Sequence, residues 1–280
     1  MTSPDPDQPA APPAPPRSGL GWRLITAAVG IPVLLGLILV GGPVFAVVVA
    51  AALVIGCLEF ARALKLTDIR VIAVAAATVA ALAVAALRGD DAVTAVLSGG
   101  VVASLIVLVI AGEIPARLPE WALSLAAVLY VGWLGQHVVG LRELPDGRDW
   151  VLLAFFTTFA TDTGAYAVGR LLGRHKLAPA LSPGKTIEGA IGGLVAGALA
   201  AWALSVVLGL DQPLVAMLAL GAAAAVAGQA GDLAESLIKR SAGVKDMGTL
   251  LPGHGGILDR LDSLLFVLPL VYYAARWWLT

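Results

Sequence analysis

Charged side chains are scarce in this sequence. Asp, Glu, Lys and Arg together make up 13% of the 280 residues, which is about half of the roughly 25% found in a typical soluble domain. Hydrophobic residues make up 59% of the chain. This composition excludes an ordinary soluble enzyme and indicates an integral membrane protein, because several apolar runs exceed the roughly 18 residues that mark a spanning helix.

Cysteine is nearly absent, and the net charge is close to zero. The one cysteine, Cys57, lies in an apolar run. It has no partner within the chain, so a disulfide framework is excluded, and we interpret Cys57 as a small buried hydrophobic side chain. The formal net charge of −1 gives no basic field to attract nucleic acid, so we expect no nucleic-acid partner.

Residues 1–21 are rich in proline and have almost no apolar bulk. Such a segment cannot bury enough surface to fold, so we predict a disordered N-terminal tail. The first apolar run is too long for the core of a signal peptide, and many more runs follow it.

Nine apolar runs follow the tail. Helices are expected for all of them, because backbone groups in lipid must be paired within the segment and no barrel-like alternation is present. The sequence therefore predicts an all-α, polytopic transmembrane bundle. The predicted spans are 22–41, 44–61, 71–87, 92–111, 121–141, 150–170, 187–209, 213–230 and 263–279.

The distribution of Lys and Arg predicts the orientation of this bundle. With a cytoplasmic N-terminus, 14 of the 18 Lys and Arg residues fall in inside segments and 4 in outside segments. Cytoplasmic loops of membrane proteins carry an excess of these residues. The sequence therefore predicts an N-in, C-out topology.

The two halves of the chain differ in their charge. We divide the chain into N-terminal transmembrane helices over 22–150 and a C-terminal catalytic region with cytoplasmic loops over 151–280. In the first part Glu59 is the main charged residue within the spans, whereas Asp162 and Glu188 fall within or at the start of spans in the second. Ionisable groups at membrane depth are costly and by default indicate a functional site.

The densest charged stretch lies at residues 228–240. If this stretch is helical, Asp232, Glu235, Ser236 and Lys239 share one face, because they are spaced at i, i+3, i+4 and i+7. A solvated helix face is the alternative interpretation. We favour a functional site, because the helix continues directly from a predicted span.

A glycine-rich loop and a pair of aspartates follow this helix. Glycines at 253, 255 and 256 allow backbone amides to approach an anion closely. His254, between them, suits either substrate contact or loop support. Asp259 and Asp262 lie three residues apart at the start of the last span, where carboxylates suit a cation such as Mg²⁺. Arg260 offers a planar donor fork for phosphate.

Residues 182–189, Ser-Pro-Gly-Lys-Thr-Ile-Glu-Gly, resemble the end of a P-loop. Pro179 stands where that motif requires glycine, and the segment opens a membrane helix, so we reject the P-loop interpretation. We predict instead a turn at a helix N-terminus, which is a natural site for an anion.

The pattern Ser236-x-x-Lys239-Arg240, Lys245-Asp246, Pro252-Gly-His-Gly-Gly256 and Asp259-Arg260-x-Asp262 resembles the signature of the phosphatidate cytidylyltransferases. The resemblance covers roughly residues 155–265. It implies transfer of CMP from CTP to phosphatidic acid, giving CDP-diacylglycerol and pyrophosphate. It also implies Mg²⁺, with room for a second cation, and a homodimer. The predicted topology places the site on the cytoplasmic side of the cell membrane, where CTP is made, while the lipid would arrive laterally through the bundle.

The resemblance and the local chemistry together give the expected site residues. The metal carboxylates would be Asp232 and Asp259, with Asp262 close by. The catalytic set would be Asp232, Lys239, Lys245, Asp246, Asp259, Arg260 and Asp262. The residues expected to bind the substrates are Ser182, Lys185, Thr186, Glu188, Ser236, Arg240, His254, Gly255 and Gly256.

Three other interpretations compete with this one. A CTP-dependent lipid kinase of related architecture would share a cation-rich site but would take a hydroxylated lipid. An ion-coupled transporter would show internal repeats and charges near the midplane, whereas here no repeat is visible and the charges gather toward one face. A nonenzymatic scaffold would leave the buried carboxylates without a purpose.

Overall fold

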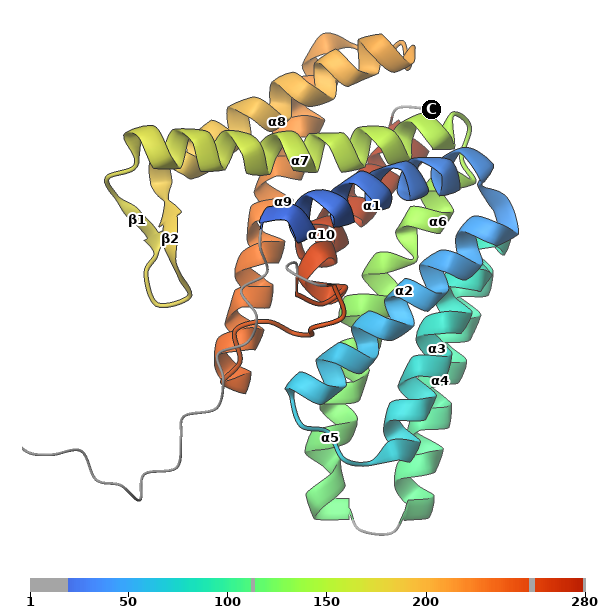
Figure 1. Ribbon diagram of the computed structural model, residues 1–280. Helices are drawn as coiled ribbons and strands as arrows, with labels where there is room; N and C mark the ends of the chain where they lie inside the picture. Colours follow the sequence, from blue (N-terminus) through green and yellow to red (C-terminus); the bar gives the residue numbers. More distant parts are fainter. Residues whose placement is uncertain (1–19, 112–113, 252–254, 279–280) are drawn as a thin grey trace, which may run out of the picture.

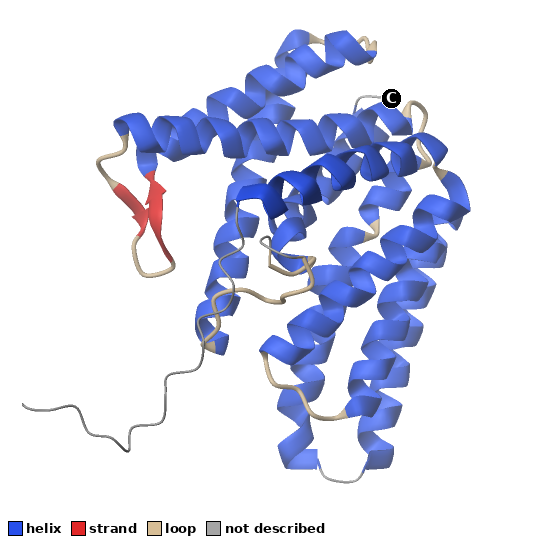
Figure 2. Cartoon of the chain, viewed as in Figure 1, coloured by secondary structure: helices blue, strands red, loops and turns tan. Residues whose placement is uncertain are grey.

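The structure is a computed structural model that describes residues 20–111, 114–251 and 255–278. Nearly all of these residues are helical, with one short pair of strands (Figures 1 and 2). The helices of the first half are α1 (Leu20–Val40), α2 (Gly42–Ala63), α3 (Ile69–Ala85), α4 (Asp90–Ala111), α5 (Ile114–Ala127) and α6 (His137–Arg142), with a 3₁₀ turn η1 (Ala86–Arg88) and a π-helical segment η2 (Val128–Trp133). Those of the second half are α7 (Gly147–Leu172), α8 (Ile187–Leu208), α9 (Leu214–Ala242) and α10 (Leu258–Trp278).

Seven of the helical segments are long and apolar enough to cross a membrane, which makes the chain a multi-pass membrane protein. They are Gly42–Ala63, Ile69–Arg88, Asp90–Ile110, Arg117–Arg142, Gly147–Leu172, Ile187–Leu208 and Leu214–Ala242. The expected helical bundle is thus confirmed. The first and last predicted spans correspond to α1 and α10. These two helices are not among the seven, so the count of nine stays a prediction. Of the predicted tail, residues 1–19 lie outside the described residues, while Leu20 and Gly21 already belong to α1.

One local expectation was wrong. Residues 182–186 do not form a turn but a strand, β2 (Ser182–Thr186), which pairs antiparallel with β1 (Lys176–Ala178). The hairpin joins the end of α7 to the start of α8 (Figure 1). Thr186 then begins α8 as its N-cap and accepts a hydrogen bond from the Gly189 amide at 3.1 Å, which satisfies one of the unpaired amides of the first turn.

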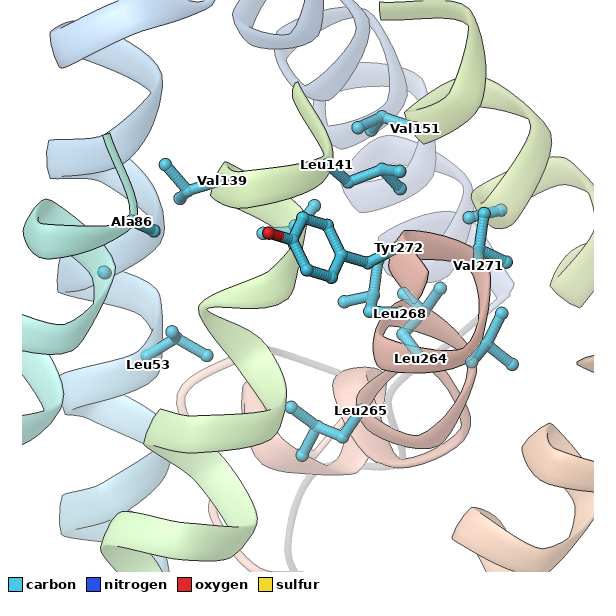
Figure 3. Close-up of a cluster of buried hydrophobic side chains, with 14 of the residues drawn as sticks. Leu53, Ala86, Val139, Leu141, Val151, Leu264, Leu265, Leu268, Val271 and Tyr272 are labelled. Carbon is cyan, nitrogen blue, oxygen red and sulfur yellow. The ribbon is translucent and has the colours of Figure 1, made fainter. Parts of the chain in front are cut away.

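The buried hydrophobic cluster extends through both halves of the chain, and α10 contributes many of its side chains. Figure 3 shows Leu264, Leu265, Leu268, Val271 and Tyr272 of this helix packed toward side chains from other helices of the bundle. Those partners are Leu53 of α2, Leu141 of α6 and Val151 of α7. Because α10 packs on helices of both halves, the position of its N-terminal end is set by the whole bundle.

The helices α7, α8 and α9 pack closely through small residues. A Cβ atom built on Gly197 of α8 would lie 2.5 Å from the Thr161 hydroxyl of α7 and 3.0 Å from Ala225 of α9. One on Gly221 of α9 would lie 2.5 Å from the Gly197 carbonyl oxygen. Small residues allow this approach, and in lipid such packing replaces the hydrophobic effect as the force between helices.

We predict that Gly197→Leu destabilises the protein, because a side chain at this position must push α7 or α9 away. Overpacking of this kind costs about 1–3 kcal/mol. The measurement is the thermal unfolding midpoint in detergent. The control is Gly99→Leu in α4, where a Cβ atom would meet nothing within 4 Å. Equal midpoints for the two variants would contradict the close packing of α7, α8 and α9.

Candidate active site

The predicted charged face of α9 is confirmed. The helix runs unbroken to Ala242, and the four polar side chains pair along one face. The Ser236 hydroxyl approaches Asp232 Oδ1 at 3.4 Å, and Lys239 Nζ forms an ion pair with Glu235 Oε2. Glu235 is 0% exposed, and its Oε1 has no hydrogen-bond partner in the described part of the chain. A buried oxygen left in this state is costly, so it indicates a place for a donor or a cation.

Asp259, at the start of α10, holds the loop between α9 and α10. Its Oδ2 accepts hydrogen bonds from the backbone amides of Met247 at 2.9 Å and Gly256 at 2.8 Å. Its Oδ1 lies 3.0 Å from Lys239 Nζ. The carboxylate is 5% exposed. Lys239 therefore links α9 to α10 through its ion pairs. Asp259 holds the loop against the start of α10.

Glu59, on α2, holds the other side of the same loop. It is 4% exposed, and it accepts hydrogen bonds from the amides of Ile257 at 3.1 Å and Leu258 at 2.9 Å. These amides open α10, where the first N–H groups have no partner within the helix. A carboxylate from another helix thus caps α10 and anchors the loop to the N-terminal half of the chain.

The glycines of the loop are explained by these two carboxylates. A Cβ atom on Gly248 or Gly256 would lie 2.2 Å or 2.5 Å from a carboxylate oxygen of Glu59, and one on Gly255 would lie 2.9 Å from Asp259 Oδ2. Gly255 also has a φ of +83°, which favours glycine. Backbone amides here do approach anions closely, as expected, but the anions in contact are side chains of the protein itself.

A polar cavity of about 480 Å³ lies between the β-hairpin and the helices α7, α8 and α9. Lys185 of β2 reaches across to α9 and forms an ion pair with Asp232 Oδ2 at 2.7 Å. Arg170 donates a hydrogen bond to the Tyr166 hydroxyl at 2.8 Å. The polar residues that line the cavity are Asp162, Tyr166, Arg170, Ser182, Lys185, Thr186, Gln229 and Asp232. Two cations within one cavity suit a ligand that carries several negative charges.

A second cavity of about 470 Å³ lies between α1, α2, α7 and α10. Its walls are mainly apolar, but one end carries Asp259, Arg260 and Asp262. Asp162 lines both cavities, so the polar and apolar spaces share this carboxylate. Asp162, Asp232 and Asp262 are near enough to repel one another, and Lys185 and Arg260 attract Asp162.

Several expected site residues have a different position or role in the structure. Thr186 caps α8, and Glu188 lies at the surface, where it pairs with His175 at 2.6 Å. Arg240 donates a hydrogen bond to the Leu181 carbonyl oxygen, at 3.4 Å. Lys245 and Asp246 are exposed. His254 lies outside the described residues.

The expected metal carboxylates lie on two helices, α9 and α10. Within residues 20–111, 114–251 and 255–278, no three His, Cys, Asp or Glu side chains converge as metal ligands would. The donor chemistry nevertheless suits a hard cation, because the mutually repelling Asp162, Asp232 and Asp262 and the unpaired Glu235 Oε1 are all carboxylate oxygens. Asp259 differs, since its oxygens already accept backbone amides and Lys239.

Three residues of this region were missed or given a smaller role from sequence. Glu59 stood out only as the main charged residue in the apolar first half. Arg170 was not among the expected site residues, but it lines the polar cavity. The Tyr130 hydroxyl, in the π-helical segment η2, is buried without a partner among the described residues and interacts electrostatically with Glu235, Asp262, Asp232 and Asp259. Segments of π-helix often occur at functional sites.

Comparisons with known proteins agree with the chemistry of this region. A family model described as the cytidylyltransferase family matches residues 21–278. A phosphatidate cytidylyltransferase of Staphylococcus saprophyticus is 44% identical over 150 residues, which are 54% of this chain and 57% of the relative. One of Bacillus subtilis is 43% identical over 148 residues, 52% of this chain and 55% of the relative. The chain thus spans about half the length of the curated relatives it matches.

We predict that Glu59→Gln loosens the loop between α9 and α10. The amide of Gln replaces one acceptor oxygen by a donor, so one of the two amides that open α10 loses its partner. Such a loss costs about 1–3 kcal/mol. Thermal unfolding in detergent should report it, together with faster hydrogen exchange over residues 243–258.

The matched control is Glu143→Gln, because Glu143 is exposed and lies outside this site. It should leave both measurements unchanged. If the exchange of residues 243–258 were also unchanged in Glu59→Gln, the anchoring role of Glu59 would be wrong.

Proposed function

The chain belongs to the cytidylyltransferase family, and we propose that it is a phosphatidate cytidylyltransferase that makes CDP-diacylglycerol. One observation carries this proposal beyond the family: a cavity with two cations and an apolar cavity share the carboxylate of Asp162. That arrangement suits one polyanionic, water-soluble substrate and one lipid whose phosphate must reach the same point. The two curated relatives described above carry the name of this activity.

The proposed reaction requires one anion to attack another. A phosphate oxygen of phosphatidic acid forms a bond to the α-phosphorus of CTP, the bond from that phosphorus to the bridging oxygen of the β-phosphate breaks, and pyrophosphate leaves with the electron pair. Repulsion between the substrates is the main obstacle, so charge neutralisation and positioning supply most of the catalysis. No covalent intermediate with the protein is needed.

Cationic side chains of the protein would neutralise part of the charge on the two substrates. Lys185 and Arg170 face the polar cavity and would bind the phosphates of CTP. Arg260, at the charged end of the apolar cavity, would bind the phosphate of the lipid. Lys239 is already paired with Glu235 and Asp259, so we assign it to holding the acidic residues in place.

The carboxylates would bind the metal cations that neutralise the rest. We propose that Asp232 and Asp262 hold Mg²⁺, with Asp162 and the free Glu235 Oε1 available for it or for a second cation. When bound, Mg²⁺ supplies positive charge that stabilises the phosphates and the leaving pyrophosphate. Asp259 was expected to be a principal ligand. Its four donors instead favour a role in holding the loop, from which it would contribute only if some of these contacts are released.

We propose that the chain crosses the cell membrane nine times, N-in and C-out, with α1 and α10 as the first and ninth spans. The excess of Lys and Arg in the segments that would then face the cytoplasm supports this topology. The polar cavity would open on the cytoplasmic side, where CTP is available. We further propose a homodimer, on the resemblance to the family alone.

The direct test is incubation of the purified protein with labelled CTP, phosphatidic acid and Mg²⁺. We expect a lipid that carries the cytidine label, release of pyrophosphate, and loss of both after chelation of the metal. Transfer of label from γ-labelled CTP to diacylglycerol or polyprenol, without a nucleotide-bearing lipid, would show the lipid kinase instead. Absence of any product with CTP, alongside ion-driven solute uptake in proteoliposomes, would favour the transporter.

We predict that Asp232→Asn lowers turnover by about 100-fold, because it removes a charge from the cation site. Its side chain is 34% exposed and its ion pair with Lys185 reaches into a cavity, so the unfolding midpoint should stay nearly the same. Asp211→Asn, an exposed aspartate in the turn before α9, is the control. A turnover for Asp232→Asn within twofold of that control would refute the role.

A further inference from the structure

The apolar cavity is lined mainly by side chains of α1, α2, α7 and α10, with Val138 of α6 beside them. On α2 the lining residues are Phe45, Val48, Val49, Ala52 and Leu53, and on α10 they include Leu261, Leu264, Leu265 and Leu268. The α2 set follows the i, i+3, i+4, i+7 spacing of a single helix face, whereas on α10 every residue from Asp259 to Leu265 lines the cavity. The helices α1 and α7 complete the wall with Gly30, Leu34, Leu37, Phe155, Thr158 and Phe159. Most of this lining is apolar.

The charged and apolar parts of this cavity are separated along its length. On α10 the charged members come first, Asp259 to Asp262, and the apolar ones follow to Leu268. On α7 the order is reversed, from Phe155 to Asp162. Six or seven residues of helix span about 10 Å. The cavity therefore suits a ligand with one polar end, beside Arg260 and the carboxylates, and an apolar body about two helical turns in length.

The cavity also communicates with the outer surface of the bundle. Among its lining residues, Val48 is 40% exposed and Phe159 is 47% exposed. In a protein of this class the outer surface at such apolar residues faces lipid. A membrane lipid can then enter from the side, without passing through water.

From these observations we infer that the cavity binds an acyl chain of the phosphatidic acid substrate, and that residues of α2 and α7 set how long a chain it accepts. This inference rests on the proposed function. It places the lipid phosphate beside Arg260 and Asp262, next to Asp162 and the polar cavity, with the acyl chain lying along α10 and α2. Figure 3 shows Leu53 of α2 and Leu264, Leu265 and Leu268 of α10, four of the lining residues.

Ala52→Phe tests this assignment by filling the apolar part of the cavity. The rate with dioleoyl phosphatidic acid should fall at least tenfold, whereas the rate with dihexanoyl phosphatidic acid should fall less than threefold, because its chains end before the obstruction. Ala51→Phe is the matched control, since Ala51 is the neighbouring, exposed position on α2 and does not line the cavity. It should leave both rates unchanged. Equal loss with the two lipids, or no loss with either, would overturn the inference.

A second measurement uses the unaltered protein and does not depend on turnover. Phosphatidic acid with a diazirine near the end of one acyl chain is bound and irradiated, and the labelled peptides are identified. We expect label on α2, α7 and α10 at the lining positions, with excess unlabelled phosphatidic acid competing for it. Equal labelling by phosphatidylcholine with the same chain, or label confined to the outer face of α4, would show only general contact with lipid and would overturn the inference.

The two experiments also separate this inference from the proposed function. If the lining positions are labelled and competed for but no nucleotide-bearing lipid is formed, the acyl-chain site stands and the proposed activity falls. If the activity is present but Ala52→Phe does not discriminate between chain lengths and the label lies elsewhere, the activity stands and the acyl-chain site falls.

Discussion

Two buried carboxylates, Glu59 and Asp259, hold the loop that connects α9 and α10. Between them they accept hydrogen bonds from the amides of Met247, Gly256, Ile257 and Leu258. Buried backbone N–H groups need hydrogen-bond acceptors, and carboxylate acceptors are few in a protein of low charge. The position of the first turn of α10, and with it Arg260 and Asp262, depends on these contacts. The candidate active site is therefore not independent of the N-terminal helices, since Glu59 belongs to α2.

The remaining acidic residues around this anchor are only partly neutralised by the cations of the chain. Asp162, Asp232 and Asp262 repel one another, and Glu235 is fully buried with one oxygen unpaired. The fold supplies only partial compensation through Lys185 and Lys239. Such an arrangement is unfavourable by itself, and the proposed cations and phosphates would stabilise it, as expected of a site that brings two anions together.

The sequence predicted the local features of this site well, and the features that depend on distant contacts poorly. The face of Asp232, Glu235, Ser236 and Lys239 follows from helical spacing alone, and the structure confirms it. The hairpin was missed because β2 pairs with β1 across a turn. The segment is polar and lacks the alternation of polar and apolar residues that marks a strand. The part played by Glu59 depends on contacts with residues 198 and 199 positions away, which no local pattern contains. The glycines of the loop correctly predicted that anions lie close to the backbone. They did not predict that these anions are the carboxylates of Glu59 and Asp259.

The measurement that tests the account most directly is a structure of the protein with Mn²⁺ and a non-hydrolysable CTP analogue, with the metal located by its anomalous scattering. The account predicts an anomalous peak within coordination distance of Asp232 and Asp262, with the triphosphate in the polar cavity beside Lys185. A nucleotide bound outside that cavity, or a metal remote from both aspartates, would contradict it.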